Sequence, residues 1–467
     1  MIRGLFERFG IELPSFGLGE VPARIMVPRI VFLGTSLALL LFGMLMIYSA
    51  SSILALTSEE CQHNPAFYLI RQAGFAAVGI VIAVVLACVD YRVWRGGVIR
   101  GMCAAIVLLL LFVVVVGNDA NGATRWIAIG PFSLQPSEFA KVVILLVGAR
   151  IAEKYFWEGS IDTMEALKLA AGGILLPLVL VLAQPDKGTT GVVLLTLLVM
   201  SYLAGVDGRY IAILCAGVLM AGIVFALKDE YSRARIFTMF NPFSDPDKSG
   251  YQLIKGFYAF GTGGLWGLGL GMSRQKYNYL PMAHNDFIFA VIGEELGLVG
   301  TVGMLAAFVL LLWAGFKIAQ SAPDMAGKLI AAGCTSLMFI QLLLNVSGVL
   351  GAFPLTGKPV PFVSYGGSSV MSSLMLVGLV MSVSLRSELP ETSYEARRKR
   401  MRLATREHVA DAYDGGVGVG RSPSPRLANL RMVEGGDSRT AGTSREARPL
   451  PYRRVDLGPS PSERLRK

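Results

Sequence analysis

The feature that most constrains this chain is a series of long apolar segments that recurs over most of its length. Residues 103–117 read Cys-Ala-Ala-Ile-Val-Leu-Leu-Leu-Leu-Phe-Val-Val-Val-Val-Gly and have no polar face, whereas an amphipathic surface helix would have one. A buried core helix would explain one such segment but not about ten of them. Apolar residues form 53% of the 467 residues and charged residues only 16%, against about 25% charged residues in soluble domains. The sequence therefore predicts an all-α integral membrane protein.

A helix needs about 20 apolar residues to cross the hydrocarbon of a bilayer, and on this basis we expect about ten transmembrane helices. They lie near Ile30–Ala50, Gly74–Cys88, Val98–Val116, Phe139–Ile151, Ala166–Leu182, Thr190–Leu203, Ile211–Leu227, Phe287–Phe316, Leu329–Ala352 and Val370–Leu385. The fourth carries Glu138, Lys141 and Arg150, and a re-entrant segment is its alternative.

Lys and Arg residues in the short flanks of the spans predict the orientation. They gather before the first span, between the second and third, and after the last, where Arg386 is followed by the basic cluster 397–400. An even number of spans puts these regions on one side of the membrane. Both termini are therefore expected in the cytoplasm, with the long loop 228–286, between spans 7 and 8, outside it. The first span is expected to be a signal anchor, because no small-residue cleavage site follows it.

Three parts are predicted: a cytoplasmic N-terminal segment (1–29), the membrane domain (30–386) and a basic cytoplasmic tail (387–467). The tail is rich in Gly, Ser, Pro and Arg, a composition typical of disorder. Its charge favours an anionic lipid surface or a protein partner over nucleic acid. Five cysteines without Cys-x-x-Cys spacing, and only three histidines, predict neither a disulfide framework nor a metal site.

Charged residues in or beside spans are costly, and each is therefore a candidate functional residue. In the segment 121–141, Pro136 and Ser137 suit a helix start, and Glu138 and Lys141 are spaced to pair on one helical face. One interpretation is a self-satisfied ion pair, with Trp126 as an interfacial anchor. The other is that Arg125 and Lys141 present cations to an anionic headgroup while Trp126 offers a flat face to a sugar.

The loop 228–286 is long for a compact protein, and long ordered loops are usually functional. Its glycine spacing resembles a dinucleotide fingerprint, but no strand–helix unit surrounds it, so we reject a nucleotide site. A diphosphate cradle is one interpretation of its cations, and snorkelling at the headgroup level is the other. These cations are Arg233, Arg235, Arg274 and Lys276.

At the end of this loop, Asn285 is expected to cap a helix with Asp286 in its first turn. The rival interpretation makes Asp286 a general base facing a cavity. Glu294 lies too deep to share its proton and is expected to have a supporting role. The segment 345–369 contains several prolines and a Gly pair, so it is expected to be non-helical backbone lining a cavity, with Ser364, Tyr365 and Gly366 as candidates for ligand contact.

Four ordered motifs resemble the SEDS family (shape, elongation, division and sporulation). They are Arg125-Trp-Ile with Gln135-Pro-Ser-Glu-Phe-Ala-Lys141; Gln184-Pro-Asp-Lys-Gly-Thr189; Leu280-Pro-x-x-His-x-Asp-Phe-Ile-Phe289 with Gly293-Glu-Glu-Leu-Gly297; and Pro361-Phe-Val-Ser-Tyr-Gly-Gly-Ser-Ser369. The likeness to the division member FtsW is greater than to the elongation member RodA, because of Val291-Ile-Gly-Glu-Glu and the long tail. Two departures are Lys358, where the family commonly has an apolar residue, and Asn285, where Thr is common.

The resemblance implies a peptidoglycan glycosyltransferase of the inverting type that polymerises lipid II at the outer face of the cytoplasmic membrane, during septal division. It also implies a class B penicillin-binding protein as partner, alongside other division proteins. The family's essential loop aspartate corresponds to Asp286, which favours the catalytic interpretation. A lipid II flippase and a non-catalytic division scaffold are the alternatives.

The resulting site prediction has one catalytic residue, Asp286. Substrate-binding residues are expected to be Arg125, Trp126, Lys141, Arg233, Arg235, Lys276, His284 and Ser364. Supporting residues are expected to be Gln135, Ser137, Glu138, Asp186, Glu294 and Gly366. No protein-bound metal is expected, although a Mg or Mn ion could share the charge of the diphosphate.

Overall fold

The computed structural model describes residues 23–387, except residues 117, 121–122, 130–131, 229, 247–249 and 278. Residues 388–467 of the predicted tail lie outside the described part, as do residues 1–22 of the predicted N-terminal segment. The first helix already begins at Ala23, inside that predicted segment.

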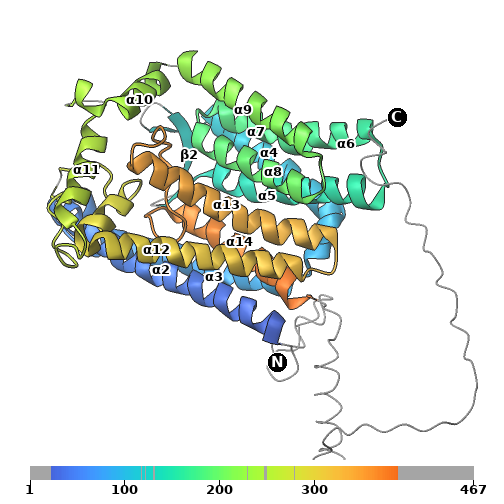
Figure 1. Ribbon diagram of the computed structural model, residues 1–467, viewed down its shortest axis with the longest axis horizontal. Helices are drawn as coiled ribbons and strands as arrows, with labels where there is room; N and C mark the ends of the chain where they lie inside the picture. Colours follow the sequence, from blue (N-terminus) through green and yellow to red (C-terminus); the bar gives the residue numbers. More distant parts are fainter. Residues whose placement is uncertain are drawn as a thin grey trace, which may run out of the picture. The chain divides into compact units, whose positions relative to one another are not determined.

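Long helices run alongside one another in the described part of the chain (Figure 1). Seven are long and apolar enough to cross a membrane: α2 (Ala23–Thr57), α3 (Phe67–Cys88), α4 (Gly97–Val116), the unit of α6 (Thr163–Ala170), π-turn η4 (Ala171–Leu175) and α7 (Leu176–Ala183), α12 (Ile288–Gln320), α13 (Met325–Val349) and α14 (Gly367–Leu385). Together with α5 (Pro136–Ala152), α8 (Lys187–Leu203) and α9 (Gly208–Lys228), ten helices correspond to the ten predicted spans. The prediction of an all-α multi-pass membrane protein is confirmed.

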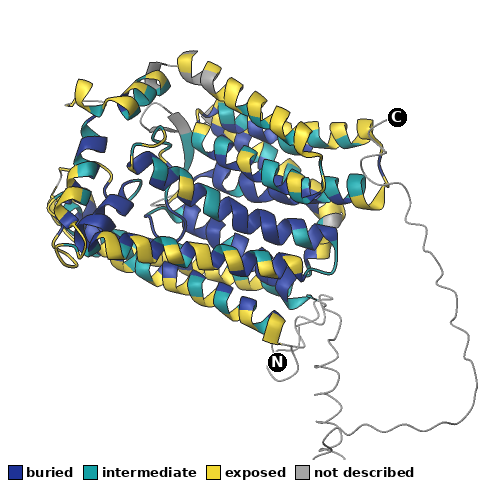
Figure 2. Cartoon of the chain, viewed as in Figure 1, coloured by how far each residue is buried: buried dark blue, intermediate teal, exposed yellow. Residues whose placement is uncertain are grey.

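The fourth predicted span, α5, is a continuous helix at the centre of the bundle. Pro136 occupies its first turn, and the π-turn η3 (Glu153–Glu158) continues it. It packs against α4, α8, α13 and α14, and most of its residues are buried (Figure 2). Its charged residues are therefore enclosed by protein, which removes the reason for considering a re-entrant segment.

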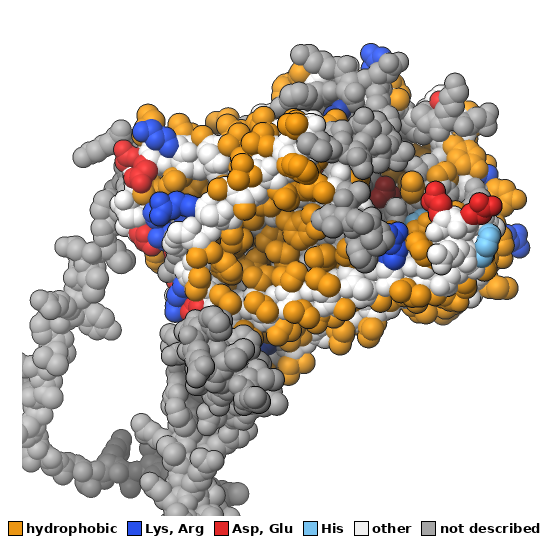
Figure 3. All heavy atoms as spheres, turned by 180° about the vertical axis from the view of Figure 1, so that it is seen from behind, with side chains coloured by type: hydrophobic (Ala, Val, Ile, Leu, Met, Phe, Trp, Pro, Cys, Tyr) orange, Lys and Arg blue, Asp and Glu red, His pale blue; other side chains and the backbone are white. Residues whose placement is uncertain are grey.

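Burial divides the helices into central and peripheral ones. In the most apolar window of α14, 83% of residues are buried inside the protein, and in α13 78%, whereas α3 and α4 reach only 17%. Exposed Leu, Val and Ile side chains cover the outer faces, and the space-filling view shows this apolar surface between more charged ends (Figure 3). An apolar outer surface of this kind suits helices that face lipid, because each helix satisfies its own backbone polar groups.

A small antiparallel sheet at the end of α4 departs from the purely helical prediction. Its strands are β1 (Asn118–Ala120), β2 (Ala123–Ile129) and β3 (Phe132–Leu134), in the order β1-β2-β3. The strands lie outside the long helices, where short hydrogen-bonded hairpins satisfy the backbone between α4 and α5. The sheet carries Arg125 and Trp126 to the end of the bundle where α5 begins.

The predicted long loop is partly helical. It contains α10 (Glu230–Phe240), the short η5 (Pro242–Ser244) and α11 (Tyr251–Gly263), followed by a glycine-rich segment, residues 264–287. That segment folds onto α12, where Gly297 has a φ of 66° inside the helix. The N–H groups of Leu298 and Val299 donate to carbonyls of the glycine-rich segment, so the kink is closed by hydrogen bonds.

Candidate functional site

The predicted site residues meet at one end of the bundle. This end holds the sheet, α10, α11 and the starts of α5, α8, α12 and α14 (Figure 1). The loop that joins α13 to α14, residues 350–366, reaches the same end and has no helix. Four separate stretches of chain are thereby brought together.

At the start of α5, four charged side chains form a buried cluster. Lys141 Nζ lies 2.6 Å from Glu138 Oε2, and Lys358 Nζ lies 2.9 Å from each carboxylate oxygen of Asp186. Lys358 Nζ also lies 3.8 Å from Glu138 Oε1. Two anions and two cations therefore neutralise one another where water is scarce, which is the arrangement that makes buried charge tolerable.

Asp186 receives most of the hydrogen bonds in this cluster. It caps α8 by accepting from the Thr189 N–H at 3.2 Å, and its Oδ2 also accepts from the Ser137 hydroxyl at 2.8 Å and the Gln135 amide at 3.0 Å. Burial alone would raise the pKa of Asp186, but the charges of Lys358 and Arg125 hold it well below its usual range. Asp186 thus ties α5, α8 and the 350–366 loop together through these contacts.

Lys358 is the residue that the sequence interpretation missed. It was noted only as a departure from the family pattern, yet its side chain is 4% exposed and lies over the first turn of α8, where a Cβ on Gly188 would approach Lys358 Cγ to 2.8 Å. The available signal was a lysine within an apolar, proline-rich segment at membrane depth, which must have a buried partner.

Asp286 lies at the same end of the bundle, in the turn before α12. The amide of Asn345 donates both to its carbonyl at 2.9 Å and to the carbonyl of Lys358 at 2.7 Å. Gly357, with a φ of 64°, lies against the carboxylate, since a Cβ there would be 3.4 Å from Asp286 Oδ2. Among the described residues, no side-chain hydrogen bond reaches this half-buried carboxylate. Burial raises the pKa of Asp286, while Lys358 and Arg235 oppose the rise.

Asn285 does not cap α12. The cap position is Phe287, and the helix begins at Ile288, so Asp286 precedes the first turn instead of lying within it. The N–H of Asn285 donates to the Met282 carbonyl and closes a turn. The chain becomes helical only at Ile288. Neither half of the structural interpretation of Asn285 and Asp286 is correct.

Three buried side-chain oxygens near Asp286 have no hydrogen-bond partner among the described residues. They belong to its neighbour Asn285, to Asn345, and to Thr356 beside Gly357. Unpaired buried oxygens are uncommon in native proteins and usually indicate a bound water or ligand. Polar groups of this kind around a free carboxylate suit a ligand rich in hydroxyl groups.

Three cations at the same end of the bundle, called the rim cations below, are held by backbone or serine groups. Arg125, on β2, donates to the carbonyls of Gln184 and Pro185. Lys187 Nζ lies 2.6 Å from Ser232 Oγ of α10, and Arg235 donates to the carbonyl of Leu355. Of these three cations, the charge of Arg235 acts on Asp286 and that of Arg125 on Asp186. Arg125 and Arg235 are half-buried, and Lys187 is exposed. Arg233 is exposed on α10, and Trp126 is half-buried on β2.

Two of the predicted phosphate ligands are occupied by protein partners. Lys141 is 2% exposed and also donates to Gln341 Oε1 at 2.8 Å. Lys276 is buried against Gly271 and lies 3.3 Å from Glu295 Oε1. A ligand would have to displace these carboxylates, so direct substrate binding by either lysine does not fit their placement.

His284 and Ser364 also contact protein groups. The His284 ring packs against Tyr68, with ring centroids 4.6 Å apart, and against Tyr365, at 5.6 Å. Burial lowers the pKa of His284 to about 4. It is neutral near pH 7 and cannot serve as a cation for phosphate. The Ser364 hydroxyl is buried and accepts from the Val360 N–H at 2.8 Å, so it closes the turn before α14.

The remaining predicted supporting residues contact protein. Glu294 accepts hydrogen bonds from the N–H groups of Arg274, at 3.0 Å, and Gln275, at 3.3 Å, which fastens the glycine-rich segment to α12. The Gly366 N–H donates to Gln72 of α3 at 3.1 Å. Within the described residues, no group of three or more His, Cys, Asp or Glu side chains could hold a metal ion.

Comparison with known proteins identifies the family. Residues 29–389 match the FtsW/RodA/SpoVE family of cell cycle proteins. The chain is 38% identical to stage V sporulation protein E of Bacillus subtilis, over 76% of this chain and 97% of that protein. It is 37% identical to the probable peptidoglycan glycosyltransferase FtsW of Trichlorobacter lovleyi, over 80% of this chain and 98% of that protein.

Solved structures agree with this assignment. The rod shape determining protein RodA of Thermus thermophilus matches with a TM-score of 0.57 and 27% identity, over 77% of this chain and 98% of that chain. A chain of a peptidoglycan synthase complex, described as coordinating polymerization and crosslinking, matches with a TM-score of 0.60 and 28% identity, over 76% of this chain and 96% of that one. This chain is a multi-pass membrane protein that belongs to the FtsW/RodA/SpoVE family.

Proposed function

We propose that the chain is a peptidoglycan glycosyltransferase of the FtsW type, which polymerises lipid II at the outer face of the cytoplasmic membrane during cell division. Relatives named as probable FtsW glycosyltransferases, 36–38% identical to this chain, support the activity. The observation that carries the proposal is the Asp286 carboxylate, whose backbone is fixed by Asn345 and which accepts no side-chain hydrogen bond within the part of the chain that the structure describes.

In this proposal Asp286 is the general base. Its carboxylate takes the proton from the 4-hydroxyl of the acceptor sugar as that oxygen attacks the anomeric carbon of the donor. The bond from that carbon to the diphosphate breaks, and the configuration inverts. A base must lie within hydrogen-bond reach of the proton that it removes, and an unpaired carboxylate beside unpaired oxygens of Asn285, Asn345 and Thr356 offers such a place.

The departing lipid diphosphate gathers negative charge, and the rim cations would stabilise it. Arg125, Lys187 and Arg235 are already positioned by contacts with backbone or serine groups, so little reorganisation is needed when charge develops. Such preorganised stabilisation is commonly the largest catalytic contribution. Lys141, Lys276 and the Asp186–Lys358 pair maintain the positions of the elements around this rim.

The proposal extends to partner and location. A class B penicillin-binding protein would crosslink the glycan that this chain makes, which is supported by the likeness to a chain of a peptidoglycan synthase complex. The expected location is the division septum of the cytoplasmic membrane, with both termini in the cytoplasm. A role for Mg or Mn stays a prediction, and glycan synthesis with and without EDTA measures it.

The decisive experiment compares glycan synthesis from purified lipid II by the native protein and by Asp286→Asn, each with and without the penicillin-binding partner. Asn is nearly the same size, so the fold should survive while the base is lost. We expect polymer from the native protein and a loss of at least about 100-fold in the variant. Equal polymer from both would remove Asp286 from the catalytic role. No polymer from either, with lipid II moving between leaflets, would favour the flippase.

A further inference from the structure

The peripheral helix α3 carries a buried amide near its start. The buried residues of α3 are Gln72, Ala76 and Gly79, and their spacing places them on one face of the helix. Packing alone would favour an apolar side chain at position 72, which is 0% exposed, because burying an amide is costly unless it forms hydrogen bonds. Both halves of the Gln72 amide are therefore expected to have partners.

Both partners of Gln72 belong to one turn, residues 364–366, directly before α14. Gln72 Nε2 donates to the Ser364 carbonyl at 3.3 Å, and Gln72 Oε1 accepts from the Gly366 N–H at 3.1 Å. On the next turn of α3, Phe75 packs against Gly367, where a Cβ would lie 2.5 Å from the ring. Because the partners of Gln72 are backbone groups, its hydrogen bonds fix the path of the chain through this turn.

The chain just before the turn is strained and needs to be held. Phe362 has a φ of 65°, a conformation that is costly for a residue other than glycine and persists only when neighbouring groups fix it. Its carbonyl lies against α2, since a Cβ on Gly43 would collide with it. The loop is therefore held by α2 at Phe362 and by α3 at the turn 364–366.

The turn 364–366 is in turn bonded to the segment that leads to Asp286. The N–H of Tyr365 donates to the His284 carbonyl at 2.9 Å, two residues before Asp286. The His284 ring also packs against the rings of Tyr365 and Tyr68, and Tyr68 lies one turn before Gln72 on α3. The start of α3 thus holds this segment through a backbone hydrogen bond and through packed rings.

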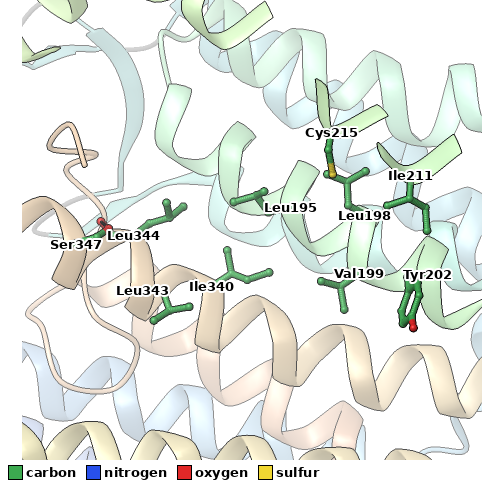
Figure 4. A pocket seen from close by; sticks show the side chains of 10 residues that line it. All are labelled: Leu195, Leu198, Val199, Tyr202, Ile211, Cys215, Ile340, Leu343, Leu344 and Ser347. Carbon is green, nitrogen blue, oxygen red and sulfur yellow. Dashed lines mark hydrogen bonds between the residues drawn. The ribbon is translucent and has the colours of Figure 1, made fainter. Parts of the chain in front are cut away.

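The contact between α3 and α14 is close. The two helices pack along one another, and a Cβ on Gly79 would lie 2.7 Å from Leu374 Cδ1. By contrast, an apolar pocket of about 580 Å³ lies between α8, α9 and α13, where Leu195 and Leu344 are among the lining side chains (Figure 4). Since Gln72 is fully buried in the close contact and both halves of its amide are bonded, it acts through the backbone and does not touch substrate.

We propose that Gln72 is a positioning residue for the base: it holds the turn 364–366, and this turn holds the segment that carries Asp286. The inference rests on the proposed function, because the position of Asp286 affects the rate only if Asp286 is the base. A base must lie within hydrogen-bond reach of the proton that it removes. Loss of both Gln72 hydrogen bonds frees the strained loop to relax, and Asp286 moves with it.

The test is Gln72→Met, which nearly keeps the size of the side chain and removes both hydrogen bonds. Its matched control is Gly79→Ala, which disturbs the same pair of helices two turns further along α3. Glycan synthesis from purified lipid II by the full-length protein, with the penicillin-binding partner present, gives kcat and KM after correction for the folded fraction. A misplacement of about 1 Å can lower a rate by about 100-fold. We expect Gln72→Met to lower kcat by roughly 10- to 100-fold, with KM within about threefold of the native value.

The Gly79→Ala control should keep the native kcat, even where its melting temperature falls. The pH profile adds a second readout. Gln72 carries no charge, so Gln72→Met should lower the whole kcat/KM profile and leave its acidic limb at the native pH. A displaced limb would show that the substitution changes the charge environment of the base, which contradicts a role in positioning alone.

The proposed function and the positioning role fail in distinguishable ways. If the native protein makes no polymer from lipid II, the proposed function fails. If the native protein makes polymer and Gln72→Met keeps the native kcat, the activity stands and the positioning role is wrong. An equal loss of kcat in Gly79→Ala would also overturn this role, because it would show a general effect of disturbing α3 and α14.

A second variant covers the case in which Gln72→Met does not fold. Gly367→Ala places a methyl group against Phe75 beside the same turn and leaves Gln72 in place. We expect it to displace the turn from α3 and to lower kcat with little change in KM. A native kcat in the folded fraction of Gly367→Ala would overturn the proposal.

Discussion

At the scale of single residues, the two lysines of the buried cluster have different neighbours and therefore different consequences. Lys141 is enclosed between Glu138 and Gln341, so it serves the interior of the bundle. Lys358 forms an ion pair with Asp186. It directly follows Gly357, which lies against the Asp286 carboxylate. The charge of Lys358 thus acts on the proposed base, although the proposed base makes no bond with it.

This arrangement predicts the pH dependence of the reaction. Burial raises the pKa of Asp286 and the positive charges of Lys358 and Arg235 lower it. Because the base must be ionised, activity should fall as the pH decreases through this pKa. Removing a cation disfavours the ionised form, so Lys358→Met should move the acidic limb of the kcat/KM profile to higher pH by up to about one unit. Arg235→Gln should move it in the same direction.

The measurement is a pH series of glycan synthesis in which each variant is corrected for its folded fraction. Lys358→Arg, which keeps the charge, is the control and should leave the limb near its native position. Two results would show that the charge of residue 358 does not act on the base. One is an acidic limb of the pH profile that does not move in Lys358→Met, and the other is an equal movement in Lys358→Arg.

At the scale of elements, the glycine-rich segment and α12 form one unit. Glu294 accepts N–H groups of that segment, and Gly297 approaches it closely: a Cβ on Gly297 would lie 2.4 Å from the Gly267 nitrogen. The positive φ of Gly297 adds strain for any other residue. Asp286 belongs to the same unit, since it precedes α12. The contacts at the kink therefore help to hold the first part of α12, and with it Asp286, in position.

Gly297→Ala should therefore destabilise the protein by about 1–3 kcal/mol, because an alanine meets both backbone strain and a collision there. Gly303→Ala, in the same helix with nothing within 4 Å of its Cβ position, is the matched control and should be neutral or stabilising by up to about 1 kcal/mol. Thermal unfolding in detergent measures both. Similar melting temperatures for the two variants would show that the kink is not under this constraint.

The helices and loops also show how much of the fold and of the candidate site could be predicted from the sequence. Apolar length located all ten helices, because each must bury its own backbone hydrogen bonds in lipid. The Glu138–Lys141 pair was predictable from spacing on one helix. The Lys358–Asp186 pair was not, since it joins residues 172 positions apart. Partners for Lys276 and His284 were hidden for the same reason, because they come from α12 and α3. The partner of Ser364 is only four residues away, in an irregular turn that no periodic pattern indicates.

At the scale of the whole molecule, the alternation of helices assigns every loop to one of two ends. Asp286, the sheet and α10 share one end, whereas the turns α5–α6, α8–α9 and α12–α13 lie at the other. Lipid II is polymerised outside the cytoplasm in the proposed function. The site end should then face outward, which agrees with the predicted cytoplasmic position of the basic flanks.

Two matched substitutions test this orientation. Ser244 in η5 is exposed at the site end, and Ser160 between η3 and α6 is exposed at the opposite end. In intact cells stripped of their wall, a membrane-impermeant maleimide should label Ser244→Cys, and should label Ser160→Cys only after permeabilisation. The native chain gives the background, because its described cysteines are buried or half-buried. The reverse pattern would put Asp286 and the rim cations on the side where the lipid-linked substrate is made, and a polymerase of the outer face could not have that topology.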